Sequence, residues 1–305
     1  MAKPRLLFVY NPNAGKAKVG AGLASYISIF SEAGYEVIAY PTKCALDAKE
    51  TVCEYLNSKA CDRIVCAGGD GTLNEVVGGS MSCDYRVPIG YIPAGTTNDF
   101  AYSLGIPTEK IKAAELAVSG KEFLCDIGKF EEQYFTYTAA FGIFTEVSYD
   151  TPQNAKNLLG RTAYILSGIN SLARIKACHM TICCDEIVLE DDFLYGMIAN
   201  TNSIGGFRNL LTKDTILDDG YYELLLIRMP QNLLELNATI AELSKGKSEN
   251  KNIYYKHVRE VHFSTEQAVP WTLDGEFGGE HKEGTIQVIP KAISYVVGEL
   301  PASAS

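Results

Sequence analysis

The chain is poor in the residues that mark several common classes of protein. It has four histidines and one tryptophan, and its nine cysteines include no C-x-x-C pair. The adjacent Cys183 and Cys184 suit neither a zinc site nor an ordinary disulfide. We therefore expect reduced, mostly buried thiols, as in a cytosolic protein.

Long apolar runs and an excess of basic residues are also missing. The N-terminal stretch MAKPRLLFVY offers too short an apolar run for a signal peptide, and no later run approaches membrane-spanning length. Lys and Arg total 27 against 37 Asp and Glu, which gives a formal net charge of −10. This balance argues against a broad nucleic-acid surface. We predict a soluble, cytoplasmic protein with no nucleic-acid partner.

The 305 residues, 47% of them hydrophobic, are enough for two domains. Apolar strands alternate with helices up to residue 127, and the strands are predicted at 5–11, 35–40, 63–67, 88–92 and 121–128. This alternation indicates a parallel sheet covered on both faces.

Beyond Asp126 the sequence becomes aromatic, β-branched and interrupted by turns. The segments 129–142, 177–201, 219–229 and 254–265 are typical of antiparallel strands in a sandwich. Helices are predicted near 157–173 and 230–245, and the apolar tail 293–300 is expected to pack against the protein.

Three strands of the first half are each followed by a loop of small and amide residues. These loops are NPNAGK (11–16), GGDGT (68–72) and PAGTTND (93–99). Because parallel strands end at one edge of the sheet, we expect the loops to converge on a ligand there. In the first loop, Asn11, Asn13 and the Gly15 backbone offer donors, but Lys16 is not followed by Ser or Thr, so this is not a P-loop.

The middle loop suits phosphate, although a plain strand-to-helix turn is the alternative interpretation. Its glycines Gly68, Gly69 and Gly71 permit positive φ and close backbone approach, so that amide N–H groups can face an oxyanion. Thr72 and Glu75 have the spacing of a capping box, which predicts a helix start near Leu73. A helix N-terminus there would attract an anion.

Asp70, in the centre of this loop, would repel a triphosphate unless a divalent cation or N–H donors stand between them. Mg²⁺ bridging phosphate and carboxylate oxygens is the usual solution. In the third loop, Thr96 or Thr97 is predicted to cap the next helix or to bind a phosphate.

The motifs NPNAGK, GGDGTLNEVVGG, IGYIPAGTTNDFA, LDDGYYEL and WTLDGE occur here in the order and spacing of a known family. The chain resembles the diacylglycerol kinase catalytic domain family, in particular its soluble bacterial members and their lipid kinase relatives, from about Arg5 to beyond Glu276. GGDGT alone is shared with NAD kinases and, loosely, with phosphofructokinases, but the later motifs favour the lipid kinases.

The resemblance implies an α/β fold of two domains. A parallel-sheet, ATP-binding domain would comprise residues 1–127, with 291–305 returning to it. Residues 128–290 would form a larger antiparallel β-sandwich domain for the lipid substrate.

The resemblance also implies roles for individual residues. The positions that match ATP contacts are Asn11, Pro12, Asn13, Ala14, Gly15, Thr42, Gly69, Asp70, Gly71, Thr72, Leu73, Asn74, Glu75 and Thr96. Asp70 and Asp126 would belong to the Mg²⁺–ATP network. Glu276 matches the proton acceptor for the attacking lipid hydroxyl, although DGE alone is typical of a hairpin turn with a solvated Glu.

A structural Mg²⁺ site is implied at the LDDGYY motif. Asp219 would supply its carboxylate, and Ile216 and Tyr221 would supply backbone oxygens. From the residues alone, Asp218-Asp219-Gly220 predicts a turn.

The leading hypothesis is therefore an ATP- and Mg²⁺-dependent kinase that converts diacylglycerol to phosphatidic acid in phospholipid biosynthesis. Alternatives are a kinase of another lipid such as phosphatidylglycerol or a sphingoid base, an NAD kinase, and a non-catalytic nucleotide-binding regulator. The expected partner is a lipid at a membrane surface, contacted peripherally. The segment 245–259 carries five Lys or Arg against one Glu and is either a solvated loop or a contact with anionic headgroups. A homodimer is left open.

Overall fold

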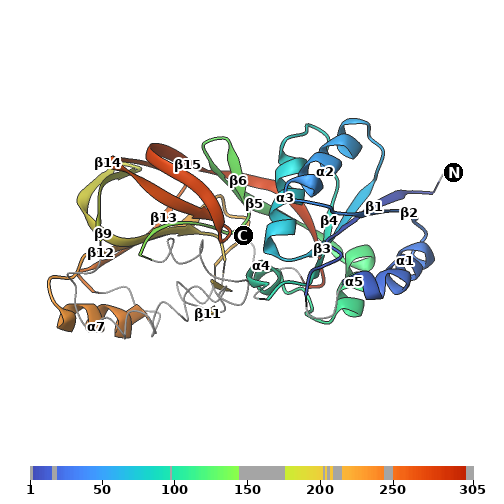
Figure 1. The fold of residues 1–305 in the computed structure, drawn as a ribbon, viewed down its shortest axis with the longest axis horizontal. Helices are drawn as coiled ribbons and strands as arrows, with labels where there is room; N and C mark the ends of the chain where they lie inside the picture. The colour runs from blue at the N-terminus through green and yellow to red at the C-terminus, as the bar shows by residue number, and fades with distance from the viewer. Residues whose placement is uncertain are drawn as a thin grey trace. The chain divides into compact units, whose positions relative to one another are not determined.

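The chain folds into two compact units, which are described separately (Figure 1). Unit 1 comprises Met1–Ile127 together with Pro290–Ser305, and unit 2 comprises Gly128–Ile289. This computed structural model describes residues 3–15, 19–96, 98–143, 176–201, 203–204, 207–208, 215–243 and 250–299. The helix predicted near 157–173 lies outside the described residues.

Unit 1 is built on a parallel sheet with the strand order β15-β4-β3-β1-β2. The strands are β1 (Arg5–Tyr10), β2 (Glu36–Pro41), β3 (Arg63–Gly68), β4 (Ile89–Pro93) and the end of β15 (Glu276–Val297). Every pairing along this path is parallel. β1, β3 and β4 are almost wholly buried, which is why their sequences are continuous apolar runs. The predicted parallel sheet is confirmed.

Helices cover both faces of this sheet. They are η1 (Val19–Gly22), α1 (Leu23–Glu32), α2 (Asp47–Asn57), α3 (Asp70–Met81), α4 (Asp99–Ser103) and α5 (Lys110–Ser119). α2 packs against α3, and α1 packs against α5, so that the two pairs form the two outer layers (Figure 1). The α2–α3 contact is close because Gly79 faces Lys49: a Cβ at Gly79 would lie 2.5 Å from the Lys49 carbonyl oxygen.

The end of β15 completes unit 1. Tyr295 pairs with Ile89 of β4, and the ring of Tyr295 meets Phe100 edge-on at a centroid distance of 5.3 Å. Asp126, in the middle of β5 (Lys121–Phe130), accepts the backbone N–H of Lys291 at 2.7 Å. The apolar tail therefore packs into the protein as a buried strand.

Unit 2 is an antiparallel β-structure. Its strands are β6 (Gln133–Phe135), β7 (Thr138–Gly142), β8 (Cys178–Cys184), β9 (Ile187–Ala199), β12 (Tyr222–Arg228), β13 (Ile253–Val258) and β14 (Glu260–Leu273), with a short hairpin of β10 (Ser203–Ile204) and β11 (Phe207–Arg208). The order β13-β12-β9-β7-β14 forms one layer, and β8 pairs with the other halves of β9 and β14. The helix α7 (Leu233–Leu243) matches the one predicted near 230–245.

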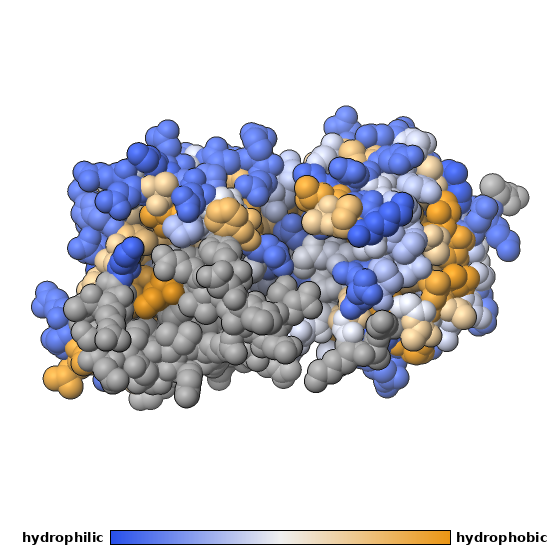
Figure 2. All heavy atoms as spheres, viewed as in Figure 1, coloured by the Kyte–Doolittle hydropathy of each residue, from blue (hydrophilic) through white to orange (hydrophobic). Residues whose placement is uncertain are grey.

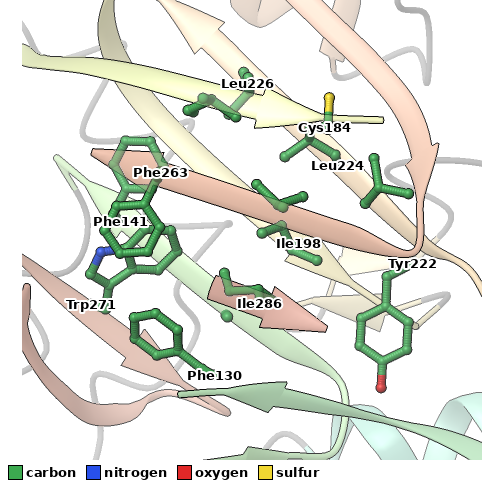
Figure 3. Packing of buried hydrophobic residues seen from close by; sticks show 14 of the residues in the cluster. Phe130, Phe141, Cys184, Ile198, Tyr222, Leu224, Leu226, Phe263, Trp271 and Ile286 are labelled. Carbon is green, nitrogen blue, oxygen red and sulfur yellow. The ribbon is translucent and has the colours of Figure 1, made fainter. Parts of the chain in front are cut away.

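The core of unit 2 is aromatic. Trp271 lies with Phe130, Phe141 and Phe263 in a cluster with ring centroids 4.6 to 5.1 Å from the indole (Figure 3). Aliphatic side chains of β9 and β12 extend this cluster. No helix of the described part of the chain is both long and apolar enough to cross a membrane.

Candidate active site

The predicted loops of unit 1 meet at the carboxyl edge of its sheet. Three backbone hydrogen bonds continue the sheet past the strand ends: Thr42 to Tyr10 at 2.9 Å, Asn11 to Ala67 at 2.9 Å, and Ala94 to Gly68 at 2.7 Å. Each joins the residue just after one strand to the end of its neighbour. The segments that follow β1, β2, β3 and β4 therefore leave the sheet at one edge, as predicted.

Close backbone contacts made by glycines bring three of these segments closer still. A Cβ at Gly15 would stand 2.7 Å from the Ala94 carbonyl oxygen, and Gly15 has a φ of +75°. A Cβ at Gly95 would stand 2.9 Å from the Cα of Gly69. The loops pack backbone against backbone, which only residues without side chains permit at these distances.

The first loop is a compact turn. The side-chain Oδ1 of Asn11 accepts the N–H of Asn13 at 3.0 Å, and the Asn11 carbonyl oxygen accepts the N–H of Ala14 at 3.2 Å. Asn11 therefore shapes the loop, while Asn13 and Gly15 are exposed and Pro12 and Ala14 are half-buried. Lys16 lies outside the described residues.

The predicted start of α3 is wrong. The helix begins at Asp70 with Gly69 as its N-cap, and no side chain caps it. Thr72 lies inside the first turn, and Glu75 instead accepts the N–H of Ala48, at the start of α2, at 3.2 Å. The distant helix end competes for the Glu75 carboxylate, so the capping box does not form. An uncapped first turn is the part of a helix that receives anions.

None of the three glycines of the second loop has positive φ, and the structure instead uses the close approach that glycine also permits. Gly69 is extended, at φ −85° and ψ −177°. A Cβ at Gly68 would lie 2.5 Å from the Thr72 hydroxyl oxygen, so this glycine makes room for the first turn of α3. Close packing therefore explains Gly68 and Gly69. Of the other predicted contacts in α3, Leu73 is fully buried, and Gly71 and Asn74 are half-buried.

Asp70 is directed towards buried β-strand residues. Burial, followed by the Asp70 carboxylate, raises the pKa of the Tyr91 hydroxyl well above its usual range. Burial raises the pKa of Cys66 too, with smaller contributions from Glu75 and Asp70. The Asp70 Oδ1 atom is itself buried. A carboxylate held at an uncapped helix start, in surroundings of low polarity, suits a divalent cation between it and phosphate.

The third loop is organised by Asn98. Asn98 has a left-handed backbone (φ 51°) and is the N-cap residue of α4. Its side chain accepts the N–H of Gly95 at 2.8 Å and donates to the Gly95 carbonyl oxygen at 3.1 Å. The predicted roles of Thr96 or Thr97 were helix capping or phosphate binding. Thr96 is not the N-cap residue, because Asn98 has that position; Thr96 is exposed, and Thr97 lies outside the described residues.

Asp126 is fully buried in unit 1, where its Oδ1 atom accepts the N–H of Lys291. One carboxylate oxygen thus holds the returning end of β15. The sequence did not single out a further acid, Asp99, which is 3% exposed in the first turn of α4, just after the third loop. Its position after a strand-end loop is the signal that could have found it.

Glu276 lies in unit 2, where it is exposed at the start of β15. Asp274 and Gly275 form the turn between β14 and β15, with φ of 50° and 83°. The hairpin expected from DGE is present, and Leu273 pairs with Glu276 across it. The structure thus agrees with the hairpin interpretation and presents Glu276 to solvent beside Phe277, which is 56% exposed.

The LDDGYY motif is a turn in which the Oδ1 atom of Asp219 accepts the N–H of Tyr221 at 2.9 Å. Ile216 and Tyr221 are half-buried beside it. The described residues contain no group of three or more His, Cys, Asp or Glu that could hold a metal ion. A cation held by Asp219 would therefore need backbone oxygens or water to complete its coordination.

Glu223 was not singled out from the sequence. It is 4% exposed and lies at the start of β12. Burial raises the pKa of Glu223 to about 8, with a smaller contribution from the charge of Asp219. Within the described ranges its Oε2 atom has no hydrogen-bond partner. A buried oxygen of this kind near Asp219 fits a hard cation at the turn.

Comparisons with known proteins agree with the fold. Residues 5–130 match the diacylglycerol kinase catalytic domain, and residues 140–297 match the YegS C-terminal NAD kinase beta sandwich-like domain. A diacylglycerol kinase of Bacillus subtilis (strain 168) is 37% identical over 277 residues, which cover 90% of each chain. One from Staphylococcus saprophyticus is 34% identical over 279 residues, covering 91% of this chain and 90% of the relative.

A crystal structure of a diacylglycerol kinase from Bacillus anthracis str. Sterne shares the fold, with a TM-score of 0.76 at 22% identity over 98% of both chains. The two matched domains correspond to a parallel α/β unit and a β-sandwich unit. On its sequence and its fold, the chain belongs to the diacylglycerol kinase family and is a phosphotransferase with an alcohol group as acceptor.

Proposed function

We propose that this protein transfers the γ-phosphoryl group of ATP to the free hydroxyl of diacylglycerol and produces phosphatidic acid, with Mg²⁺ as cofactor. The observation that carries the proposal is the meeting of the glycine loops at the uncapped start of α3. There, backbone N–H groups and the helix dipole can receive the phosphates without a lysine.

In this proposal the residues of unit 1 bind and orient the donor. The 11–15 and 93–96 loops would flank the phosphates, and Asp70 and Asp126 would hold the cation. Bound Mg²⁺ would neutralise phosphate charge and so favour attack on the γ-phosphorus. A second Mg²⁺, at Ile216, Asp219 and Tyr221, would stabilise the turn before β12.

Glu276 accepts the proton of the lipid hydroxyl as that oxygen attacks phosphorus. Its exposure at the start of β15 leaves its carboxylate accessible to a substrate, and the exposed Phe277 offers an apolar neighbour for a lipid. A carboxylate within hydrogen-bonding reach of the hydroxyl is what general-base assistance requires.

We further propose that this cytoplasmic enzyme meets the membrane peripherally through α7. Leu233 and Leu234 are 37% and 81% exposed, and Figure 2 shows apolar atoms at the surface over this helix. The side chain of Lys251 is 67% exposed and lies against the same end of α7, 2.7 Å from Glu235. Apolar side chains beside a cation suit an anionic bilayer surface.

A radiolabel assay tests the proposed reaction. With γ-labelled ATP, Mg²⁺ and vesicles containing diacylglycerol, we expect labelled phosphatidic acid in the organic extract and none without the divalent cation. Phosphatidylglycerol, a sphingoid base and NAD, offered in parallel, test the alternatives. Label in another lipid would replace diacylglycerol as the acceptor, and label only in water-soluble NADP would overturn the lipid kinase assignment.

A further inference from the structure

The turn that carries Glu276 is held by the residue two positions before it. Asp274 and Gly275 both have left-handed φ, as a two-residue hairpin with a type I′ turn requires. Asp tolerates the left-handed conformation at the first turn position, and in many hairpins it does so with an exposed side chain. In this turn, however, Asp274 is only 4% exposed.

The Asp274 carboxylate accepts four hydrogen bonds from the segment that leads into β7. Its Oδ2 atom accepts the N–H and the hydroxyl of Thr136, both at 2.7 Å. Its Oδ1 atom accepts the N–H of Tyr137 at 2.9 Å and the N–H of Thr138 at 3.0 Å. Both oxygens are thus engaged, and hydrogen bonds to an ionised acceptor are about twice as strong as neutral ones.

The backbone of Asp274 is fixed to the same segment. Its N–H donates to the Thr138 carbonyl oxygen at 2.8 Å, and the Tyr137 hydroxyl donates to the Asp274 carbonyl oxygen at 3.4 Å. The preceding residue, Leu273, pairs with Ala139 of β7. The turn is therefore attached to a neighbouring strand by side chain and backbone, and a hairpin needs no such attachment to form.

The attachment also restrains Glu276, because Glu276 pairs with Leu273 directly across the turn. The backbone of Glu276 is fixed by the buried Asp274, while its carboxylate stays exposed. A general base must lie within hydrogen-bonding distance of the hydroxyl, so a fixed backbone favours catalysis. A displacement of the base by about 1 Å can lower the rate by about a hundredfold.

We propose that Asp274 is a positioning residue that holds the Glu276 carboxylate in place for the lipid hydroxyl, with the Thr136 hydroxyl as one of its anchors. This inference rests on the proposed function of Glu276 as the proton acceptor. Asp274 itself is too deeply buried and too fully hydrogen-bonded to receive the proton.

A double-mutant cycle of Asp274→Asn and Glu276→Gln tests the proposal. An asparagine at 274 keeps one acceptor oxygen but turns an NH₂ group towards donors, so the turn shifts. We expect Asp274→Asn to lower kcat by about tenfold to a hundredfold, with the KM for ATP within about twofold of wild type. In the Glu276→Gln background the same change should have no further effect on the residual kcat.

The outcomes separate this proposal from the proposed function. Full turnover by Glu276→Gln would show that Glu276 is not the base, whatever Asp274 does. A different result would overturn the positioning role alone. In it, Glu276→Gln greatly lowers kcat, while Asp274→Asn either leaves kcat unchanged or lowers it by the same factor in both backgrounds.

A second pair of variants covers the case in which Asp274→Asn does not fold. Thr136→Val removes only the hydroxyl that donates to Asp274, whereas Thr136→Ser retains it. We expect Thr136→Val to lower kcat by about threefold to tenfold without changing the KM for ATP, and Thr136→Ser to restore it. Equal kcat values for the two variants would contradict the proposal.

Discussion

The backbones of Gly69 and Gly95 lie so close that a Cβ at Gly95 would stand 2.9 Å from the Cα of Gly69. The same Cβ would also lie 2.9 Å from the Asn98 Oδ1 atom, which organises the third loop. The two loops at the start of α3 and α4 therefore share one packing contact. A change in either loop is transmitted to the other.

Gly95→Ala should consequently weaken nucleotide binding. The added methyl group must separate the loops, so we expect the KM for ATP to rise by about tenfold or more while the melting temperature falls only slightly. Gly78→Ala is the matched control, because a Cβ there meets nothing closer than 3.8 Å and the residue lies within α3. An unchanged KM in Gly95→Ala would contradict the role of this contact.

Glu75→Ala should destabilise the protein by removing the acceptor for the Ala48 N–H at the start of α2. We expect a loss of about 1 kcal/mol in the free energy of unfolding, measured with urea, and a smaller effect from Glu54→Ala on the exposed side of α2. Thr72→Ala should be additive with Glu75→Ala. If the two changes instead had clearly non-additive effects on the free energy of unfolding, Thr72 and Glu75 would form a capping box.

Glu223→Gln should stabilise the protein increasingly as pH rises. The pKa of about 8 in the folded state lies above that of an unfolded glutamate, about 4.3. The folded protein therefore retains a proton that the unfolded chain releases, and wild-type stability is lost as pH rises from about 4.3 to about 8.

Urea unfolding in EDTA at pH 5.5 and pH 8 measures this effect. The advantage of Glu223→Gln over wild type should be larger at pH 8, by on the order of 1 to 3 kcal/mol. The exposed Glu283→Gln should show no such change between the two pH values. An advantage of equal size at both pH values would rule out an unusual proton affinity at Glu223.

Leu234→Glu and Lys251→Glu should each weaken sedimentation with vesicles that contain anionic phospholipid. Each change removes about 1 to 2 kcal/mol of membrane affinity, but only the lysine effect should vanish at high salt. Val188→Glu, at another apolar side chain that is 66% exposed, is the control and should bind normally. Lys247, another basic residue of the 245–259 segment, lies outside the described residues. Unaltered binding by Leu234→Glu would exclude α7 as the contact.

The strands of unit 1 and the meeting of its loops were predictable because their signals are local. Continuous apolar runs such as β1 and β3 indicate buried parallel strands, and small residues directly after them must lie at one sheet edge. Asp70 and Glu276 were singled out by motifs that can be recognised in one sequence, and their roles stay predictions. The antiparallel strands of unit 2 were equally predictable from its aromatic and β-branched segments.

The errors and omissions involve partners that are distant in sequence. Glu75 was assigned to its own helix because the competing N–H, that of Ala48, belongs to another one. Asp274 looked like an ordinary turn residue, since its donors lie 136 to 138 positions earlier in the chain. Burial, which sets the properties of Glu223, depends on packing that no local pattern of charges shows.

The return of β15 to unit 1, supported by the hydrogen bond between Asp126 and Lys291, has a consequence for the order in which the two units fold. On the ribosome, the residues up to 127 are synthesised before the strand that pairs with β4, which is contributed by Tyr295 and its neighbours. The whole of unit 2 is synthesised in between, so it can fold while unit 1 still exposes one edge of its sheet. The sheet of unit 1 is therefore completed only after unit 2 and the residues around Tyr295 have been translated.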